Sequence, residues 1–184
     1  MEDSKIIELL FDRSEQGITE LSGKYGPACR KIAENILNNH SDAEECVNDA
    51  YLAVWNTIPP KNPDTLYSYV CRIVRNIAIK KYHSNTAKKR NSFYDVALDE
   101  IKECFPSSQS VENEIESLEI AQAIDRFLET IDKQSRVLFV RRYYFSDSIE
   151  ALANIFKTSR HNVSVRLSRI RKKLKKHLMK EGVF

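Results

Sequence analysis

Apolar residues recur at spacings of three and four along most of this chain, and this rhythm constrains its fold more than any other feature. The clearest stretch starts at Ala43, continues to Ile58 and stops at Pro59-Pro60. Such spacing places the apolar side chains on one face of an α-helix. The 184 residues include only four glycines and five prolines, which are too few for a turn-rich β protein. The sequence therefore predicts an all-α fold.

The first 92 residues contain four stretches with this spacing. A short one covers residues 6–11 and a longer one covers 18–37, where Gly26-Pro27 is expected either to kink or to divide the helix. The third is expected to begin at Ser41, which would be the N-cap of a capping box. The fourth begins at Leu66, after a proline-rich loop. We therefore predict one four-helix domain over residues 1–92.

Residues 93–113 lose this periodicity and include the serine-rich run from Pro106 to Ser110. We predict a flexible acidic linker over 93–113. Helical spacing then resumes, so residues 114–184 are predicted to form a second helical domain. Its expected helices are 115–131, 133–145, 149–156 and 160–178, the last two starting after the N-caps Ser148 and Ser159.

Charge is distributed unevenly along the chain, although the net charge is only +3. Residues 1–71 carry a net charge of −6, residues 72–94 carry +7, residues 95–132 carry −9 and residues 133–184 carry +11. Clustered positive charge attracts polyanions. The pattern predicts two surfaces that face a polyanion, separated by an acidic segment that avoids DNA.

The C-terminal segment has the pattern of a DNA-binding helix-turn-helix. After the break Lys157-Thr158-Ser159, one narrow apolar stripe runs from Val163 to Leu174, and residues 157–180 hold ten Lys or Arg and no Asp or Glu. A helix that enters the major groove keeps one stripe on its own domain and presents polar or basic side chains to the DNA. A basic surface helix without a ligand is the alternative, whereas the narrow stripe disfavours a helix lying on a membrane.

Several other classes are excluded by what the sequence lacks. No apolar run is long enough to span a bilayer, and the acidic start is not a signal peptide, so a cytoplasmic location is expected. No catalytic motif is present, and the four histidines are scattered. We therefore predict no enzyme, no small-molecule substrate, no cofactor and no metal. The cysteines form no C-x-x-C pair and are expected to be reduced, buried thiols: Cys29, Cys46, Cys71 and Cys104.

Three segments, in order, resemble a known family. Asp42 to Trp55 (DAEECVNDAYLAVW) and Leu66 to Ala78 (LYSYVCRIVRNIA) are similar to the two signature helices of sigma region 2, and Ser148 to Leu174 is similar to the helix-turn-helix of sigma region 4. The chain thus resembles an extracytoplasmic-function sigma factor of the sigma-70 family. The resemblance implies a region 2-like domain over 1–92 and a region 4-like domain over 114–184.

The resemblance also implies partners and contact residues. The partners would be core RNA polymerase, promoter DNA and an anti-sigma factor. Core polymerase would bind Asp42, Glu45, Asn48, Asp49 and Asn56. The melted −10 element would bind Arg72, Arg75, Asn76, Lys80 and Lys81, with the loop 59–65 holding a flipped base. Tyr69 and Tyr82 lie on the apolar stripe, so packing is favoured over base stacking for them.

The −35 element would meet the last long helix. Base or shape readout is expected from Arg160, His161, Ser164, Val165 and Arg169, and phosphate contact from Arg166, Lys172, Lys173 and Lys176. The sequence departs from the family here, because Lys157 stands where the family has a turn glycine and must accept an unfavourable backbone angle or reshape the turn. His161-Asn162 and Ser164-Val165 also differ, so relatives do not indicate the promoter preference.

Two rival functions belong to other classes. A stand-alone helix-turn-helix regulator would need a dimer interface or an effector pocket in place of the basic helix at 72–82. An enzyme such as a recombinase with an appended DNA-reading domain would need a catalytic constellation, which the sequence does not show. The sigma factor is the favoured prediction, with the regulator as the alternative.

Overall fold

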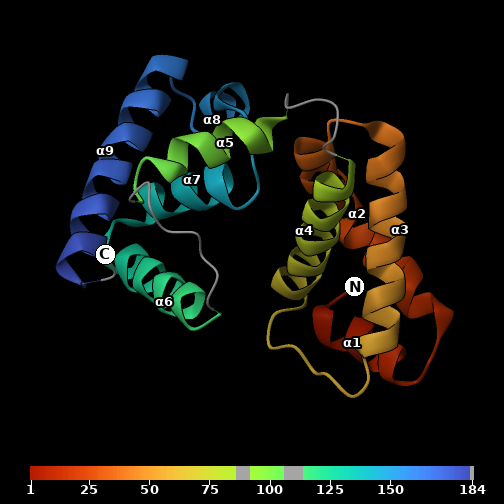
Figure 1. Cartoon of the computed structure of the whole chain (residues 1–184). Coiled ribbons are helices and arrows are strands. Elements are labelled where there is room, and N and C mark those ends of the chain that lie inside the picture. Colours follow the sequence, from red (N-terminus) through yellow and green to blue (C-terminus); the bar gives the residue numbers. More distant parts are fainter. Residues whose placement is uncertain (86–91, 106–113, 183–184) are drawn as a thin grey trace. The chain divides into compact units, whose positions relative to one another are not determined.

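The computed structural model describes residues 1–85, 92–105 and 114–182, and within 114–118 it describes the backbone alone. All regular elements in these ranges are helices (Figure 1), which confirms the predicted all-α class. The chain divides into two compact units, unit 1 over Met1–Phe93 and unit 2 over Tyr94–Phe184. Among the helices of the described ranges, none combines the length and apolarity that a membrane span requires.

The described part of unit 1 contains four helices whose apolar faces meet in one core. Helix α2 contacts all three others, and α3 also packs on α4. The buried side chains include Leu21, Ile36, Val54 and Val74, each with no exposed surface. The helices are α1 (Asp3–Phe11), α2 (Glu15–Leu37), α3 (His40–Thr57) and α4 (Leu66–Asn85).

Helix α2 is continuous through Gly26-Pro27, so the sequence does not divide it there. Gly26 is buried where α2 meets α3, and a Cβ atom placed on it would lie 3.2 Å from the Tyr51 hydroxyl. The missing side chain therefore allows α3 to approach closely. Packing against three neighbouring helices outweighs the one backbone hydrogen bond that Pro27 cannot donate.

The capping residue of α3 differs from the prediction. Asn39, not Ser41, is the N-cap, and its side-chain oxygen accepts a hydrogen bond from the Asp42 backbone N–H at 3.1 Å. Asn38 ends α2 in the left-handed conformation (φ 49°). Asparagine tolerates this conformation and caps helices as well as serine does. Because Asn38 and Asn39 complete the turn, α3 has already begun when the chain reaches Ser41.

Within the described ranges, unit 2 holds five helices, one of which lies in the predicted linker. Helix α5 covers Phe93–Lys102, and the following Cys104 is buried in the unit 2 core. The expectation of a flexible linker is therefore wrong for 93–105, while 106–113 lies outside the described residues. Ile101 and Phe105 pack against the same core, which explains why this short helix persists. The others are α6 (Glu114–Thr130), α7 (Lys133–Tyr143), α8 (Ile149–Ile155) and α9 (Arg160–Lys180).

Helices α8 and α9 form the predicted helix-turn-helix. Ser148 and Ser159 are the N-caps, and each hydroxyl accepts a backbone hydrogen bond at 3.1 Å. Lys157 adopts φ 49°, so the turn keeps the left-handed geometry despite lacking glycine. The predicted stripe is buried and extends one turn further, to Val163, Leu167, Ile170, Leu174 and Leu178.

Candidate nucleic-acid interface

The face of α9 that is turned away from the core carries most of the residues predicted to read the −35 element. His161, Ser164, Arg169, Lys172, Lys173 and Lys176 are exposed, and Val165 and Arg166 are half-buried. The Ser164 hydroxyl donates a hydrogen bond to the Arg160 carbonyl at 3.1 Å, which leaves its lone pairs available. Helix α9 therefore presents a mixed polar and basic surface of the kind that enters a major groove.

Arg160 differs from its neighbours because it has an acidic partner. Its guanidinium lies 2.5 Å from the Glu150 carboxylate of α8, in an exposed ion pair. Such a pair contributes little to stability. It does neutralise the charge at the first residue of α9 and hold the side chain toward α8.

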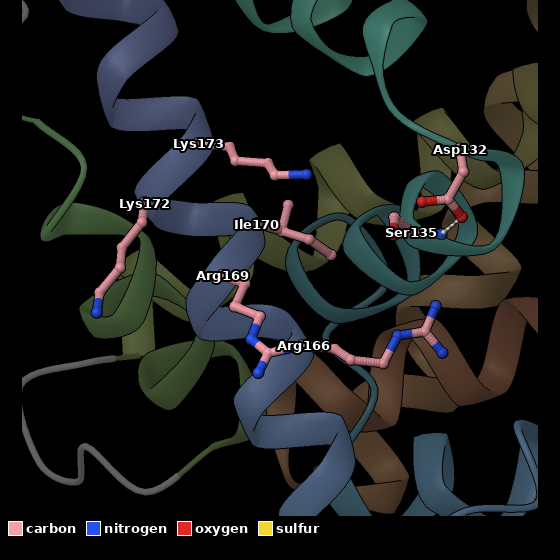
Figure 2. Close-up of a pocket in the computed structure, with 7 residues that line it drawn as sticks. All are labelled: Asp132, Ser135, Arg166, Arg169, Ile170, Lys172 and Lys173. Carbon is pink, nitrogen blue, oxygen red and sulfur yellow. Dashed lines mark hydrogen bonds between the residues drawn. The ribbon is translucent and has the colours of Figure 1, made fainter.

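A groove of about 430 Å³ runs between α9 and the start of α7. Figure 2 shows Arg166 and Lys173 extending from α9 toward the α7 side, whereas Lys172 extends the opposite way. Asp132, the N-cap of α7, accepts a hydrogen bond from the Ser135 N–H at 2.9 Å. These hydrogen bonds from Ser135, aided by Arg166, hold the pKa of Asp132 below its usual value. One anionic and several cationic groups leave the groove positive.

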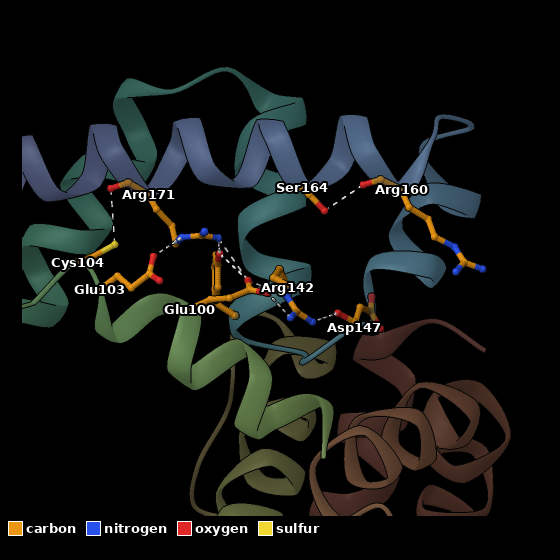
Figure 3. A network of polar contacts seen from close by, with 9 residues as sticks. Glu100, Glu103, Cys104, Arg142, Asp147, Arg160, Ser164 and Arg171 are labelled. Carbon is orange, nitrogen blue, oxygen red and sulfur yellow. Dashed lines mark hydrogen bonds and ion pairs between the residues drawn. The ribbon is translucent and has the colours of Figure 1, made fainter. Parts of the chain in front are cut away.

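A network of charged and polar groups joins α5, α7 and α9 (Figure 3). Glu100 accepts hydrogen bonds from Arg142 at 2.6 and 3.1 Å, from the Tyr143 hydroxyl at 3.1 Å and from Arg171 at 3.4 Å. Arg142 is 1% exposed and also donates to the Asp147 carbonyl at 2.8 Å. Burial raises the pKa of Tyr143, so this phenol stays protonated and can donate. Sequence patterns had assigned no role to Glu100.

The basic face of α4 is only partly free. Arg72, Asn76 and Lys80 are exposed, and Arg75 is half-buried. Lys81 lies 2.5 Å from Glu45 and 3.3 Å from Asp42, both on α3. The hydrogen bond from Lys81 to Glu45 raises the pKa of Lys81. Lys81 thus joins two residues predicted to bind polymerase instead of standing free for DNA. The basic run 88–90 lies outside the described residues.

The residues of α3 predicted to bind polymerase share one exposed face. Glu45, Asn48, Asp49 and Asn56 are exposed, and Asp42 is half-buried beside Lys81. Leu52 lies among them, four residues after Asn48 and four before Asn56, and is 59% exposed. Sequence reasoning missed Leu52, although its spacing from the polar residues would have identified it. A single exposed leucine is common on protein surfaces, so Leu52 is of interest only because it lies among the polar residues already predicted to bind polymerase.

The tyrosines near α4 have local partners. The Tyr69 hydroxyl donates to the Thr57 hydroxyl at 2.8 Å and ties α4 to the end of α3. Tyr82 is half-buried against His83, with ring centroids 5.6 Å apart. Tyr67 is 37% exposed and lies 5.2 Å from the Tyr25 ring. These contacts favour packing for Tyr69 and Tyr82, as expected, and leave Tyr67 as the more accessible ring.

Most of unit 1 matches a known protein family. Residues 21–88 match the family model of sigma-70 region 2. This range begins within α2 and includes all of α3 and α4. Unit 1 contains a sigma-70 region 2. The predicted relationship to the sigma-70 family is thereby confirmed for this part of the chain, and the acidic face of α3 and the basic face of α4 both belong to region 2.

Two further comparisons extend beyond region 2. No curated protein matches the sequence. A solved structure, "Structure of CnrH in complex with the cytosolic domain of CnrY", is similar over 97% of this chain and 97% of that chain, with 19% identity and a TM-score of 0.45. The assignment of a function therefore rests on region 2 and on the geometry of the helix-turn-helix.

Proposed function

We propose that this protein is a sigma factor of the extracytoplasmic-function class, which binds core RNA polymerase and directs transcription from specific promoters. The observation that carries the proposal is the region 2 match, because it covers the two helices, α3 and α4, that display the acidic and basic faces. A basic helix-turn-helix in unit 2 supports it, since a second DNA-reading surface is what promoter selection requires.

Helix α3 is the proposed polymerase-binding element. Glu45, Asn48, Asp49 and Asn56 surround the exposed Leu52, so an apolar contact is ringed by polar groups. This is the usual arrangement of an interface in which one buried side chain supplies much of the affinity. Asp42 would contact the polymerase directly, and its ion pair with Lys81 would also hold that lysine beside the binding face.

The Leu52→Asp variant tests this surface. Leu52 is exposed in the free protein, so the substitution should leave the free energy of unfolding within about 0.5 kcal/mol of wild type. Binding to core polymerase, measured by titration with labelled protein, should weaken at least tenfold. The Phe11→Asp variant, which changes an exposed apolar residue of α1, is the matched control and should bind normally. Equal binding by Leu52→Asp and wild type would remove α3 from the interface.

Helix α4 is the proposed contact to the melted −10 strand. Arg72, Arg75, Asn76 and Lys80 would neutralise phosphates and hold unstacked bases, with Tyr67 as the accessible ring for stacking. We leave Lys81 out of this set, because its ammonium group is already compensated by Asp42 and Glu45.

Helix α9 is the proposed reader of the −35 duplex. His161, Ser164, Val165 and Arg169 would face base edges, and Lys172 and Lys176 would face phosphates. Arg160 is left out of the base-reading set because Glu150 holds it toward α8. No small molecule, cofactor or catalytic step is part of this mechanism.

Run-off transcription with bacterial core polymerase tests the whole proposal. The pure protein should convert core enzyme, which is inactive on a linear promoter template, into one that makes a transcript of defined length. Promoters selected from a random library with the reconstituted enzyme would supply the template. A chain that binds DNA tightly alone but never directs initiation would be a stand-alone helix-turn-helix regulator instead. The anti-sigma partner and the cytoplasmic location stay predictions from the sequence.

A further inference from the structure

Helix α9 carries cationic side chains on both sides of its buried stripe, and the two sides differ in their partners. On one side, Arg160 pairs with Glu150, and Arg171 pairs with Glu100 and Glu103. Figure 3 shows Arg160 and Arg171 leaving α9 on the same side. We call this side the paired flank. The opposite side, with Arg166 and Lys173, is called the open flank.

The paired flank is closed by α5. The Arg171 guanidinium donates to the Tyr143 hydroxyl at 2.8 Å and to Glu100 at 3.4 Å, and it lies 3.7 Å from Glu103. The Cys104 thiol also lies 3.6 Å from the Arg171 carbonyl, which holds the end of α5 against α9. Only 18% of the Arg171 side chain is exposed. A phosphate approaching Arg171 would therefore meet the carboxylates of Glu100 and Glu103.

The open flank lines the groove beside α7. No acidic side chain in the described ranges forms an ion pair with Arg166, Arg169 or Lys173, although Asp132 stands at the far wall. The Arg166 guanidinium lies 5.8 Å from the centre of the Phe156 ring, which supports the side chain without neutralising its charge. Its positive charge thus stays available to a ligand.

We propose that α5 sets one edge of the DNA interface, so that a phosphodiester backbone of duplex DNA is held in the groove of the open flank and is kept off the paired flank. The inference rests on the proposed function, because it assigns the phosphate contacts of the same helix. Glu100 is then a positioning residue. It fixes Arg171 and α5 on one side of α9 and leaves Arg166, Arg169 and Lys173 to face the DNA on the other.

The physical basis is counterion release. Each Lys or Arg that neutralises a phosphate of duplex DNA adds about 0.9 to the slope of log affinity against log salt concentration. An arginine already neutralised by protein carboxylates releases no counterion when DNA binds. Cations two residues apart on α9, Arg171 and Lys173, should therefore contribute very differently to the salt dependence.

The test compares variants of the full-length chain on a fluorescein-labelled duplex of random sequence, with binding followed by anisotropy over a range of KCl concentrations. Lys173→Ala should lower the salt slope by about one. Arg171→Gln is the matched variant and should leave the slope unchanged. Because Arg171→Gln alters a partly buried network, Glu103→Gln provides a second measurement. Glu103 is 72% exposed, so this variant should fold normally and leave the slope unchanged.

The salt-slope measurements test this inference independently of the run-off transcription assay. An equal fall in slope for Arg171→Gln and Lys173→Ala would overturn it, as would a rise of about one in Glu103→Gln. A wild-type chain that does not bind the duplex even at the lowest salt would also overturn it. If the slopes follow the expected pattern but run-off transcription fails, the open flank still binds DNA and the sigma factor proposal alone is lost.

Discussion

The two units enclose different kinds of groups. Among the described residues, unit 1 buries apolar side chains, three thiols and the neutral polar residues Asn35 and Ser92. Unit 2 buries Arg142 and Asp147 within its core. Burial of apolar surface has no direction, so it does not require one particular partner atom for each side chain. A buried arginine is stable only when specific hydrogen-bond acceptors are placed against it. Unit 2 therefore depends on the position of Glu100, whereas no charged side chain is buried among the described residues of unit 1.

Thiol reactivity should give the largest contrast between the units. Burial raises the pKa of Cys29 and Cys46 from 9.0 to about 12, and that of Cys104 to about 11. At neutral pH the thiolate fraction should be roughly a thousandfold lower for Cys29 and Cys46, and roughly a hundredfold lower for Cys104, than for a thiol with a pKa of 9.0. Alkylation of the folded protein by iodoacetamide, mapped by mass spectrometry, should therefore label Cys104 before Cys29 and Cys46.

The same shifts have a consequence for stability. A raised thiol pKa in the folded state stabilises the fold fully below the unfolded value of 9.0, and this contribution is lost as pH rises toward 12. The free energy of unfolding of unit 1 should thus fall above pH 9. Equal labelling rates for Cys29 and Cys104, or alkaline stability that is flat to pH 11, would contradict the comparison.

Removing the central carboxylate should affect unit 2 alone. Glu100→Ala leaves Arg142, which is 1% exposed, without its main acceptor and should destabilise unit 2 by about 3 kcal/mol. Trp55 is the only tryptophan and lies in α3, so its fluorescence reports unit 1. In urea, the helix signal of unit 2 should shift to lower concentration while the Trp55 transition stays in place.

A matched core variant in unit 1 completes this experiment. Leu66→Ala removes a fully buried side chain and leaves a cavity. The free energy of unfolding measured from the Trp55 transition should therefore fall by about 2–5 kcal/mol. If Glu100→Ala moved the Trp55 transition equally, the two units would unfold together, and the contrast between their cores would not govern stability.

Helix capping provides a smaller test within unit 1. Asn39→Ala removes the side chain that accepts from the Asp42 N–H and should cost about 1 kcal/mol. Ser41→Ala, two residues away, should change the free energy of unfolding by less than about 0.5 kcal/mol. Urea titration of Trp55 fluorescence measures both. A larger effect at Ser41 than at Asn39 would restore the capping box that the sequence suggested.

The smallest expected effect distinguishes two neighbouring lysines of α4. Lys80 is exposed, whereas Lys81 pairs with Asp42 and Glu45. Lys80→Ala should lower the salt slope for a single-stranded −10 oligonucleotide bound by the reconstituted polymerase by about 0.7. Lys81→Ala should lower it by less, because the lysine is already compensated. Equal slopes for the two variants would mean that core polymerase draws Asp42 and Glu45 away from Lys81.

Much of the fold could be predicted from periodicity. The buried stripe of α9 and the caps Ser148 and Ser159 follow directly from the spacing of apolar residues and from the chemistry of helix starts. The cap of α3 could not, because Asn39 and Ser41 are equally good caps and the choice depends on where α2 ends. The left-handed turn at Asn38 settles that choice.

The candidate interface was less predictable. Composition showed which segments are basic, but not which cations are already neutralised. Lys81 is paired across 36 residues of sequence and Arg171 across 71, to acids on other helices. Helix α5 was missed although Tyr94, Ala97 and Ile101 recur at spacings of three and four, because the helix is short and was grouped with the serine-rich run that follows it.

Lys157 closes the corner between α8 and α9 with a backbone conformation that glycine would adopt at no steric cost. An exposed lysine at this corner adds a positive charge directly ahead of α9, the proposed DNA-reading helix, where glycine would add none. Replacement by glycine would relax the corner and weaken its attraction for phosphate at once. The joint between the two helices therefore carries a positive charge that glycine would not supply, at the cost of backbone strain.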